Sequence, residues 1–232
     1  MSAIINGIDI RKVYKTRKVE YEALRGVSFS IEKGEFVALV GPSGSGKTTL
    51  LDIIGLLDNP TDGRLIIDGK DVSKLGENER ADMRNKKIGF VFQSYNLISY
   101  LSTLENVELP LAAAGVPFWK RREKAIQVLS LIPGMLDFKD KRPNELSGGQ
   151  QQRVAIARAL VNDPDIIIAD EPTANLDTVT GMAIVNLLKQ LSVERNVTVV
   201  MATHDPDMIK KCDRIIHIRD GKIEGVETRS GQ

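Results

Sequence analysis

The chain has 232 residues, of which 42% are hydrophobic and 27% charged, and its formal net charge is +1. This length fits one α/β domain with a small appended subdomain, and the near-neutral charge gives no electrostatic reason to expect nucleic acid or an anionic membrane surface as a partner. The single cysteine, Cys212, excludes an internal disulfide and fits a reducing compartment. No apolar run approaches the roughly 18 residues that a membrane-spanning helix needs, so a role at a membrane would require a partner.

The first part of the chain is predicted to be mainly β-strand. In order, we expect strands at residues 3–14, 21–31, 36–40, 64–67 and 88–92, a turn at 32–35 and a helix at 47–57. The run at 36–40 is apolar throughout, which suits a strand buried on both faces of a sheet. Asp68-Gly69 directly after the alternating residues 64–67 indicates a hairpin.

Helical patterns dominate the middle of the chain. Residues 94–146 predict mostly helix, with loops near Pro117, Pro133 and Pro143, and we interpret them as an α-helical insertion between the halves of an α/β core. Beyond the insertion, we expect helices at residues 150–160 and 178–191 and strands at 165–169, 197–202 and 214–218. The alternation of strands and helices favours a mostly parallel sheet.

Residues 41–48, GPSGSGKT, fit the pattern G-x-x-x-x-G-K-[ST] in full. A loop of small residues between a strand and a helix lets backbone N–H groups converge on a triphosphate, and the helix adds its positive N-terminal end. Lys47 can then reach the outer phosphates, while Thr48 offers a hydroxyl to Mg²⁺. A chance glycine-rich turn is the alternative, and the flanking strand and helix disfavour it.

Two acids, Asp170 and Glu171, end the apolar run at residues 166–169. An Asp at a strand end beside a phosphate loop can hold Mg²⁺ through its water shell. Because side chains alternate along a strand, we expect Glu171 to point away from Asp170, where it could polarise a water that attacks the γ-phosphate. A surface turn that happens to begin Asp-Glu-Pro is the alternative, and it loses weight beside a phosphate loop.

The segment 146–150, LSGGQ, lies just ahead of these acids. Together with the motifs above, it closely resembles the signature of the ATP-binding cassette family, and the resemblance spans essentially the whole chain. It implies an α/β fold: a P-loop NTPase (RecA-like) core with a mostly parallel sheet, an N-terminal antiparallel β subdomain and an inserted α-helical subdomain. The expected division of this single domain is a catalytic core at 1–93 and 147–232, and a helical subdomain at 94–146.

The resemblance also implies roles for single residues. Tyr14 resembles the aromatic that stacks on adenine, although a half-buried strand tyrosine is the plainer interpretation. Gln93 resembles the glutamine that contacts Mg²⁺ and the attacking water, and His204 resembles the histidine that touches the γ-phosphate, so Glu171 and His204 are the expected catalytic pair. The implied ATP-binding residues are Tyr14, Gly41, Pro42, Ser43, Gly44, Ser45, Gly46, Lys47, Thr48 and Thr49, and the implied Mg²⁺ ligands are Thr48, Gln93 and Asp170.

The signature residues Ser147, Gly148, Gly149 and Gln150 would form a second anion cradle at the start of a helix near Gln150. In the family this cradle serves the ATP of a partner subunit, so two ATP molecules are held in a head-to-tail homodimer with two-fold symmetry. Asp177 belongs to the loop that crosses the interface. An ordinary helix N-cap at Ser147 is the alternative interpretation.

Residues 84–97, RNKKIGFVFQSYNL, and 104–110, LENVELP, resemble the branch that serves lipoprotein release and macrolide-type export. They also resemble the cell-division ATPase of similar size. The resemblance implies an ATP-hydrolysing subunit at the cytoplasmic face of the cell membrane, which powers a separate integral membrane permease by transport or mechanotransmission.

Other functional classes fit the sequence less well. DNA-repair cassettes carry a long coiled coil where only about fifty residues separate Gln93 from Ser147, and translation cassettes occur in pairs. A non-enzymatic nucleotide-binding module would call for a damaged site, whereas Lys47 and the other expected site residues are present. Trp119 precedes three basic residues, which could indicate base stacking, but a solvated helix start fits better and we expect no nucleic acid.

Overall fold

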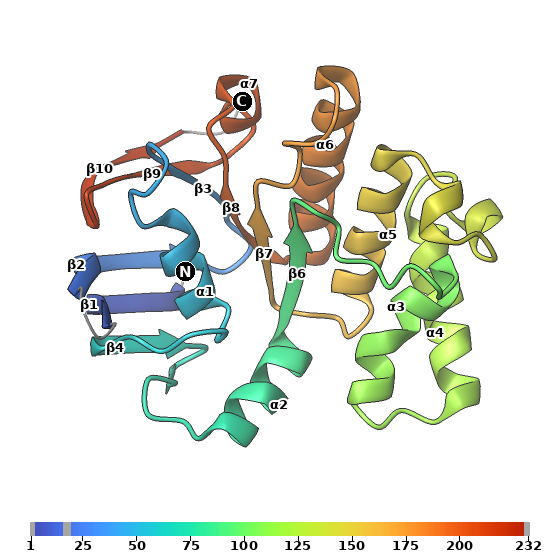
Figure 1. Cartoon of the computed structure of the whole chain (residues 1–232), viewed down its shortest axis with the longest axis horizontal. Helices are drawn as coiled ribbons and strands as arrows, with labels where there is room; N and C mark the ends of the chain where they lie inside the picture. The colour runs from blue at the N-terminus through green and yellow to red at the C-terminus, as the bar shows by residue number, and fades with distance from the viewer. Residues whose placement is uncertain (1–2, 16–19, 230–232) are drawn as a thin grey trace.

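In the computed structural model of the chain, residues 3–15 and 20–229 are described, and they form two sheets with helices packed around the larger one (Figure 1). The smaller sheet is N-terminal and antiparallel, with the strand order β2-β1-β4-β5. Its strands are β1 (Ala3–Lys15), β2 (Glu20–Glu32), β4 (Asp62–Ile67) and β5 (Lys70–Asp71). The hairpin predicted at Asp68-Gly69 is confirmed, since both residues have the positive φ that a tight hairpin turn needs, 50° and 74°.

The larger sheet has six strands in the order β10-β9-β3-β8-β7-β6, and every pairing except that of β9 with β10 is parallel. Its strands are β3 (Phe36–Val40), β6 (Ile88–Phe92), β7 (Ile166–Asp170), β8 (Thr198–Ala202), β9 (Arg214–Arg219) and β10 (Lys222–Thr228). The sequence prediction of a mostly parallel sheet is therefore confirmed. The order places β8 between β3 and β7, which brings the carboxyl ends of these strands together.

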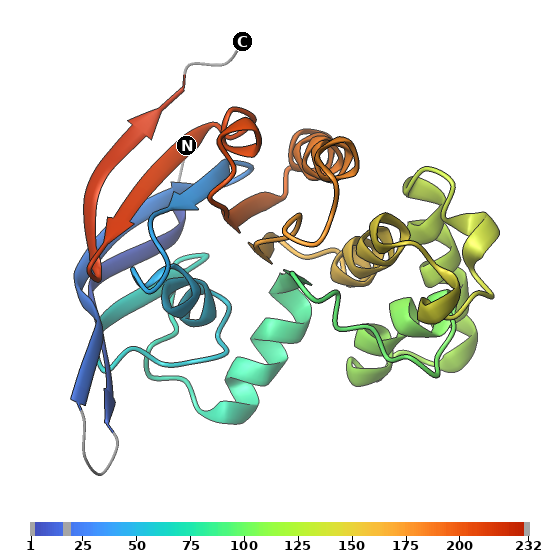
Figure 2. The same cartoon turned by 45° about the horizontal axis from the view of Figure 1, so that its top comes forward.

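The strand period divides the apolar side chains between two cores. Phe36 and Ala38 of β3 belong to the core beneath α5 (Gly148–Leu160) and α6 (Thr178–Arg195), whereas Val37 and Leu39 belong to the core around α1 (Lys47–Ile54). Because neighbouring side chains on a strand point to opposite faces, a continuous apolar run covers both sides of the sheet. The helix α1 lies between the two sheets (Figure 2).

The predicted helical insertion comprises α3 (Thr103–Ala113), α4 (Phe118–Leu131) and two short 3-10 turns, η1 (Leu136–Phe138) and η2 (Pro143–Glu145). A capping box starts α3: the Ser102 hydroxyl accepts from the Glu105 N–H, and the Glu105 carboxylate accepts from the Ser102 N–H. Asn106 is fully buried, and its amide donates to the carbonyls of Ile98, Leu101 and Ser102, which ties the preceding loop to the helix.

Several elements differ from the sequence prediction. The helices α2 (Glu77–Lys87) and α7 (Pro206–Ile209) and the strand β10 were not predicted, because α2 buries only Arg80 and β10 is a mostly exposed edge strand, so neither has a strong apolar period. The helix α1 ends at Ile54 rather than residue 57, since Gly55 caps it and Leu56 adopts a positive φ of 58°.

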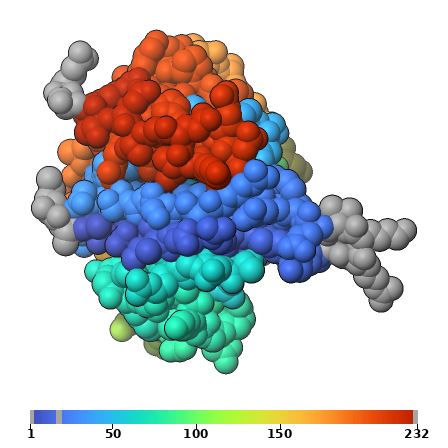
Figure 3. Space-filling model, turned by 90° about the vertical axis from the view of Figure 1, so that its left-hand side faces the viewer, coloured from blue at the N-terminus to red at the C-terminus, as the bar shows by residue number. Residues whose placement is uncertain are grey.

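Strands from the two ends of the described chain lie side by side on one side of the molecule. Figure 3 shows β9 and β10 beside the N-terminal sheet, where the Arg25 N–H donates to the Gly221 carbonyl at 2.8 Å. Trp119, in the first turn of α4, is 72% exposed, as expected of a solvated helix start. Among the described residues, no helix is both long and apolar enough to cross a membrane.

Candidate functional site

The phosphate loop lies at the carboxyl end of β3 and opens into a pocket of about 520 Å³. The carboxyl ends of β7 and β8, the strands next along the sheet, deliver Glu171 and His204 to the same pocket. This edge is where open α/β sheets generally bind ligands. The residues that line the pocket are Tyr21, Ala23, Gly41, Pro42, Ser43, Gly44, Gly46, Lys47, Thr48, Thr49, Glu171 and His204.

Each glycine of the loop meets a different steric demand. A Cβ on Gly41 would lie 1.9 Å from the carbonyl oxygen of Ile218, so only glycine fits there. Gly46 has a φ of 106°, and its Cβ would lie 2.8 Å from the carbonyl oxygen of Ala23. Gly44 also has a positive φ, of 76°, but it faces open space, so it supplies backbone curvature at the mouth of the cradle.

Lys47 is the first residue of α1 and is only 8% exposed. Its Nζ donates to the carbonyl oxygens of Gly41 and Pro42, at 2.8 and 2.9 Å, which holds the ammonium against the loop. No side chain caps the N-terminus of α1, because the N-cap residue is Gly46. The first-turn N–H groups and a lysine cation therefore face the same space, which fits a polyphosphate.

The Thr48 side chain hydrogen-bonds with Asp170 at the end of β7. Burial raises the pKa of Asp170, and the Glu171 charge adds to this, while the Thr48 hydrogen bond and Lys47 act in the opposite direction. A hydroxyl and a carboxylate are the hard oxygen donors that Mg²⁺ prefers, and Mg²⁺ usually binds through few protein ligands together with substrate phosphates. This donor set therefore fits the expected ion.

Glu171 follows the last residue of β7 and has a positive φ of 42°. Its N–H donates to the Ala202 carbonyl at 3.0 Å, which keeps it beside β8. The left-handed backbone, rather than the alternation of a strand, sets its direction, so it lines the pocket. Its Oε1 lies 3.3 Å from Nδ1 of His204, an exposed residue that follows β8. The expected catalytic pair is thus in contact.

Gln93 and Asp177 lie outside the pocket lining. Gln93 follows β6 and is exposed, and its carbonyl accepts from the Asn175 side-chain amide at 3.0 Å. Asp177 is the N-cap of α6, where its carboxylate accepts from the Thr180 N–H at 3.0 Å, and these hydrogen bonds with Thr180 lower the pKa of Asp177. The loop that carries Asn175 therefore touches the segment of Gln93, a link the sequence did not suggest.

Tyr14 lies next to the pocket rather than in its lining. Its hydroxyl donates to Oδ2 of Asp58 at 3.0 Å, and partial burial raises its pKa, opposed by a hydrogen bond with Thr49 and aided by Asp58. The aromatic within the lining is Tyr21, the cross-strand partner of Tyr14, whose hydroxyl donates to the Gly44 carbonyl at 3.2 Å. Sequence reasoning missed Tyr21, although a usable signal was its place at the start of the predicted strand 21–31, directly after the strand that ends at Tyr14. The adenine role of Tyr14 stays a prediction.

The signature segment is also away from the pocket. Ser147 caps α5: its hydroxyl accepts from the Gln150 N–H at 3.3 Å, and the Gln150 side chain accepts from the Ser147 N–H at 2.8 Å. The helix begins at Gly148, two residues before the expected start, because the capping box organises the two glycines into its first turn. The N-cap interpretation of Ser147 is therefore correct for the single chain, and a role toward another nucleotide stays a prediction.

Comparison with known proteins identifies the family to which the chain belongs. Residues 24–174 match the ABC transporter family. An uncharacterized ABC transporter ATP-binding protein of Thermotoga maritima is 53% identical over 229 residues, which cover 99% of this chain and 97% of that protein. The lipoprotein-releasing system ATP-binding protein LolD 1 of Rhodopseudomonas palustris is 44% identical over 227 residues, covering 97% of this chain and all of LolD 1 (100%).

The macrolide export ATP-binding/permease protein MacB of Syntrophobacter fumaroxidans is 49% identical over 218 residues, which cover 93% of this chain but only 30% of MacB. Among solved structures, the dimeric post-hydrolysis state of the ATP-binding cassette MJ0796 of Methanocaldococcus jannaschii, bound to ADP and Pi, is 45% identical and matches with a TM-score of 0.89, covering 98% of this chain and 100% of that one. The chain therefore belongs to the ABC transporter family, as an ATP-binding subunit whose relatives include the ATPases MacB and LolD.

Proposed function

We propose that the chain binds ATP with Mg²⁺ at the phosphate loop, hydrolyses it, and uses the energy to drive a separate membrane partner. The observation that carries the proposal is the convergence of Lys47, Glu171 and His204 on one pocket from three neighbouring strands. A cation, a carboxylate and an imidazole at one phosphate cradle are the groups that phosphoryl transfer needs, because catalysis there is mostly positioning and charge stabilisation.

In this mechanism the loop N–H groups and Lys47 hold the β- and γ-phosphates. Thr48 and Asp170 would hold Mg²⁺, and the bound ion would supply positive charge to offset the charge that develops on the phosphate oxygens. Glu171 orients and deprotonates the attacking water, and its position beside His204, at 3.3 Å, keeps the carboxylate aimed into the pocket. His204 is exposed, so its ring is free to reach a γ-phosphate at the pocket mouth.

The complete site would be shared between two copies of the chain. The signature residues do not line the pocket of their own chain, yet Ser147 is exposed at the N-terminus of α5. In a head-to-tail dimer, this second cradle would close over the ATP on the other copy's Lys47, and Asp177 would lie near the interface. The dimeric state of the relative MJ0796 with ADP and Pi supports this arrangement.

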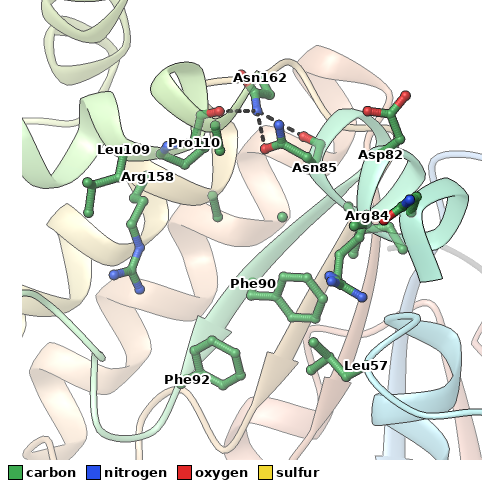
Figure 4. A pocket seen from close by; sticks show the side chains of 16 residues that line it. Leu57, Asp82, Arg84, Asn85, Phe90, Phe92, Leu109, Pro110, Arg158 and Asn162 are labelled. Carbon is green, nitrogen blue, oxygen red and sulfur yellow. Dashed lines mark hydrogen bonds between the residues drawn. The ribbon is translucent and has the colours of Figure 1, made fainter. Parts of the chain in front are cut away.

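A groove of about 640 Å³ separates α2 and β6 from the helical insertion and offers a place for the membrane partner (Figure 4). Phe90 and Phe92 form its floor, with rings stacked 5.6 Å apart, and Leu57, Leu109 and Pro110 add apolar surface. The groove borders the segment of Gln93, because Phe92 lines it, so a helix bound there would act on the residue expected to contact Mg²⁺ and the attacking water. We place the subunit at the cytoplasmic face of the membrane, in lipoprotein-release or macrolide-export work, with a cell-division role as the second candidate.

Release of inorganic phosphate from ATP by the purified chain, with Mg²⁺ and after its removal by a chelator, tests the enzymatic proposal. We expect steady, Mg²⁺-dependent release. If the chain bound ATP but released no phosphate, it would be a nucleotide-binding module and not an enzyme.

Cysteine cross-linking tests the partner surface. Single cysteines at positions 95–101 should cross-link to the membrane partner in native membranes, whereas a cysteine at Glu224, on the edge strand β10, should not. Cross-links found only at the control position would overturn the groove assignment.

A further inference from the structure

The segment that carries Gln93 has an unusual backbone. Tyr95 and Asn96 are consecutive non-glycine residues with positive φ, of 59° and 50°. Such residues persist only where their surroundings hold them in place. The hydrogen bond from the Tyr95 N–H to the Phe92 carbonyl, at 3.1 Å, closes a tight turn around Gln93. Something outside the turn must stabilise it.

Arg158, in the last part of α5, supplies that contact. Its Nη2 donates to the Tyr95 carbonyl at 2.8 Å, and its Nη1 donates to the Asn96 carbonyl. A guanidinium suits this task because its donors form a rigid fork that spans two acceptors. Arg158 is partly buried, and this burial lowers the pKa of its guanidinium.

The same tyrosine also touches the second cradle. A Cβ built on Gly148 would lie 2.8 Å from the Tyr95 hydroxyl oxygen, so the tip of the ring lies against the first residue of α5. One helix therefore contacts Tyr95 twice: Gly148 meets its ring, and Arg158 binds its backbone. These contacts connect the turn around Gln93 to the cradle at Ser147.

We propose that Arg158 is a positioning residue, which fixes the turn of Gln93 against the second cradle and so aligns a subunit's own ATP site with the cradle it presents to its partner. The inference rests on the proposed function. A change at the γ-phosphate that moves Gln93 would shift Tyr95, and through it α5 and Ser147. Arg158 also lines the groove, where it and Arg84 flank Phe90 and Phe92 in the view of Figure 4, so an occupant of the groove would meet the same guanidinium.

The test compares Arg158→Gln with Arg80→Gln in the full chain. Arg80 is a matched control: it is buried, and its Nη2 donates at 2.8 Å to the carbonyl of Leu56, another residue with positive φ, away from Gln93. Both variants lose stability, which thermal melting measures. Only Arg158→Gln should lower kcat, by about 10²-fold as expected for a misplaced catalytic group, with the affinity for ATP changed less than about 2-fold.

Arg158→Lys keeps the charge but cannot span both carbonyls, so its kcat should be intermediate, and it serves as the test variant if Arg158→Gln does not fold. A double-mutant cycle with Gln93→Ala identifies the route. If Arg158 acts through Gln93, the second substitution should add little to the first. Equal losses in both backgrounds, or a wild-type kcat in both Arg158 variants, would overturn the inference.

A second readout follows the link to the cradle. In a Glu171→Gln background, Arg158→Lys should raise the ATP concentration needed for half-maximal dimerisation, while Arg80→Lys should leave it unchanged. Equal dimerisation in both would also overturn the inference. Failure of the proposed function looks different, because the chain with wild-type Arg158 would then neither bind nor hydrolyse ATP.

Discussion

We propose the N-termini of α1 and α5 as the two anion cradles of the chain, and they differ in how many N–H groups of the first turn already have a partner. At α1 the N-cap is Gly46, no side chain accepts from the first-turn N–H groups, and Lys47 is buried beside them. At α5 the N-cap is Ser147, whose hydroxyl accepts from Gln150 in a capping box, and neither the cap nor the first turn carries a cation. An uncapped helix with a lysine is a complete phosphate site, whereas a capped one contributes only part of a site.

The second cradle therefore needs another molecule to become useful. Its exposed Ser147 and the backbone of Gly148 and Gly149 can contact a phosphate, but the charge must come from elsewhere. Lys47 of another copy is the obvious source. The difference between the cradles thus explains why a symmetric pair of identical chains would form two sites rather than four.

The largest effect is expected for the rate of ATP hydrolysis at the first cradle, with ATP binding there unchanged. Glu171→Gln should slow hydrolysis by about 10²- to 10⁴-fold, because the amide cannot deprotonate water, and ATP binding should survive because Lys47 is untouched. Phosphate release and titration with labelled ATP measure the two. Glu227→Gln is the control, since it removes another Glu–His pair, with His217 at 2.8 Å, and neither residue lines the pocket. Wild-type turnover in Glu171→Gln would assign the water to another group.

The next effect concerns the second cradle alone. Glu171→Gln should dimerise on adding ATP and stay monomeric with ADP or without nucleotide, because slow hydrolysis leaves ATP within the interface. Adding Ser147→Arg should raise the dimer dissociation constant by about 100-fold or more, since a bulky side chain fills the cradle. Sedimentation measures both. A double mutant that still dimerises would show that the signature segment does not reach the partner's nucleotide.

Lys47→Ala tests the first cradle, at α1, by removing its cation. Loss of an ammonium that binds anionic oxygens should weaken ATP binding about 10- to 100-fold, from about 1.5–3 kcal/mol for a charged hydrogen bond. Equilibrium titration with labelled ATP measures it. Lys87→Ala is the control, because Lys87 pairs with Asp165 outside the pocket. Unchanged affinity in Lys47→Ala would mean that this loop is not the nucleotide site.

The smallest effect is expected for Ser147→Ala, which tests whether Ser147 only caps α5 or also contacts a nucleotide of the partner. Ser147→Ala and Ser102→Ala remove equivalent N-caps, with cap distances of 3.3 and 3.2 Å, so each should cost about 1 kcal/mol and about 2–4 °C in Tm. Neither should alter ATP binding by the monomer. Only Ser147→Ala should weaken ATP-induced dimerisation of the Glu171→Gln variant. Equal dimerisation in both would leave Ser147 as a structural cap alone.

The parts of the fold that were predicted correctly carry strong local patterns. The apolar runs of β3, β7 and β8 are each covered on both faces, so burial and pattern agree. The missed elements lack such a pattern. The helix α2 holds Arg80 in its buried position, where the guanidinium donates to the Leu56 carbonyl, and this tertiary contact has no apolar signature.

The same distinction holds for the site. The phosphate loop was recognisable because its glycines and Lys47 occur at a fixed spacing within eight consecutive residues, although the close contacts that require Gly41 and Gly46 come from Ile218 and Ala23. Two contacts join segments that are distant in sequence: the hydrogen bond of Tyr21 to Gly44, and that of Arg158 to the turn of Gln93. Glu171 takes its direction from a positive φ beside β8. No spacing rule in a single sequence encodes those contacts.

The order of the amino acids alone shows which groups are available: the phosphate loop, the acids at the end of β7, the histidine after β8 and the serine before α5. Turn geometry, helix capping and apolar runs depend on a few neighbouring residues, so the chain specifies them locally. That Glu171 and His204 meet at the mouth of Lys47's loop depends on tertiary packing, because the order β3-β8-β7 requires β3 to pair with β8, which lies more than a hundred residues further along the chain. The same packing turns Ser147 away from that pocket, which leaves its cradle for a second molecule.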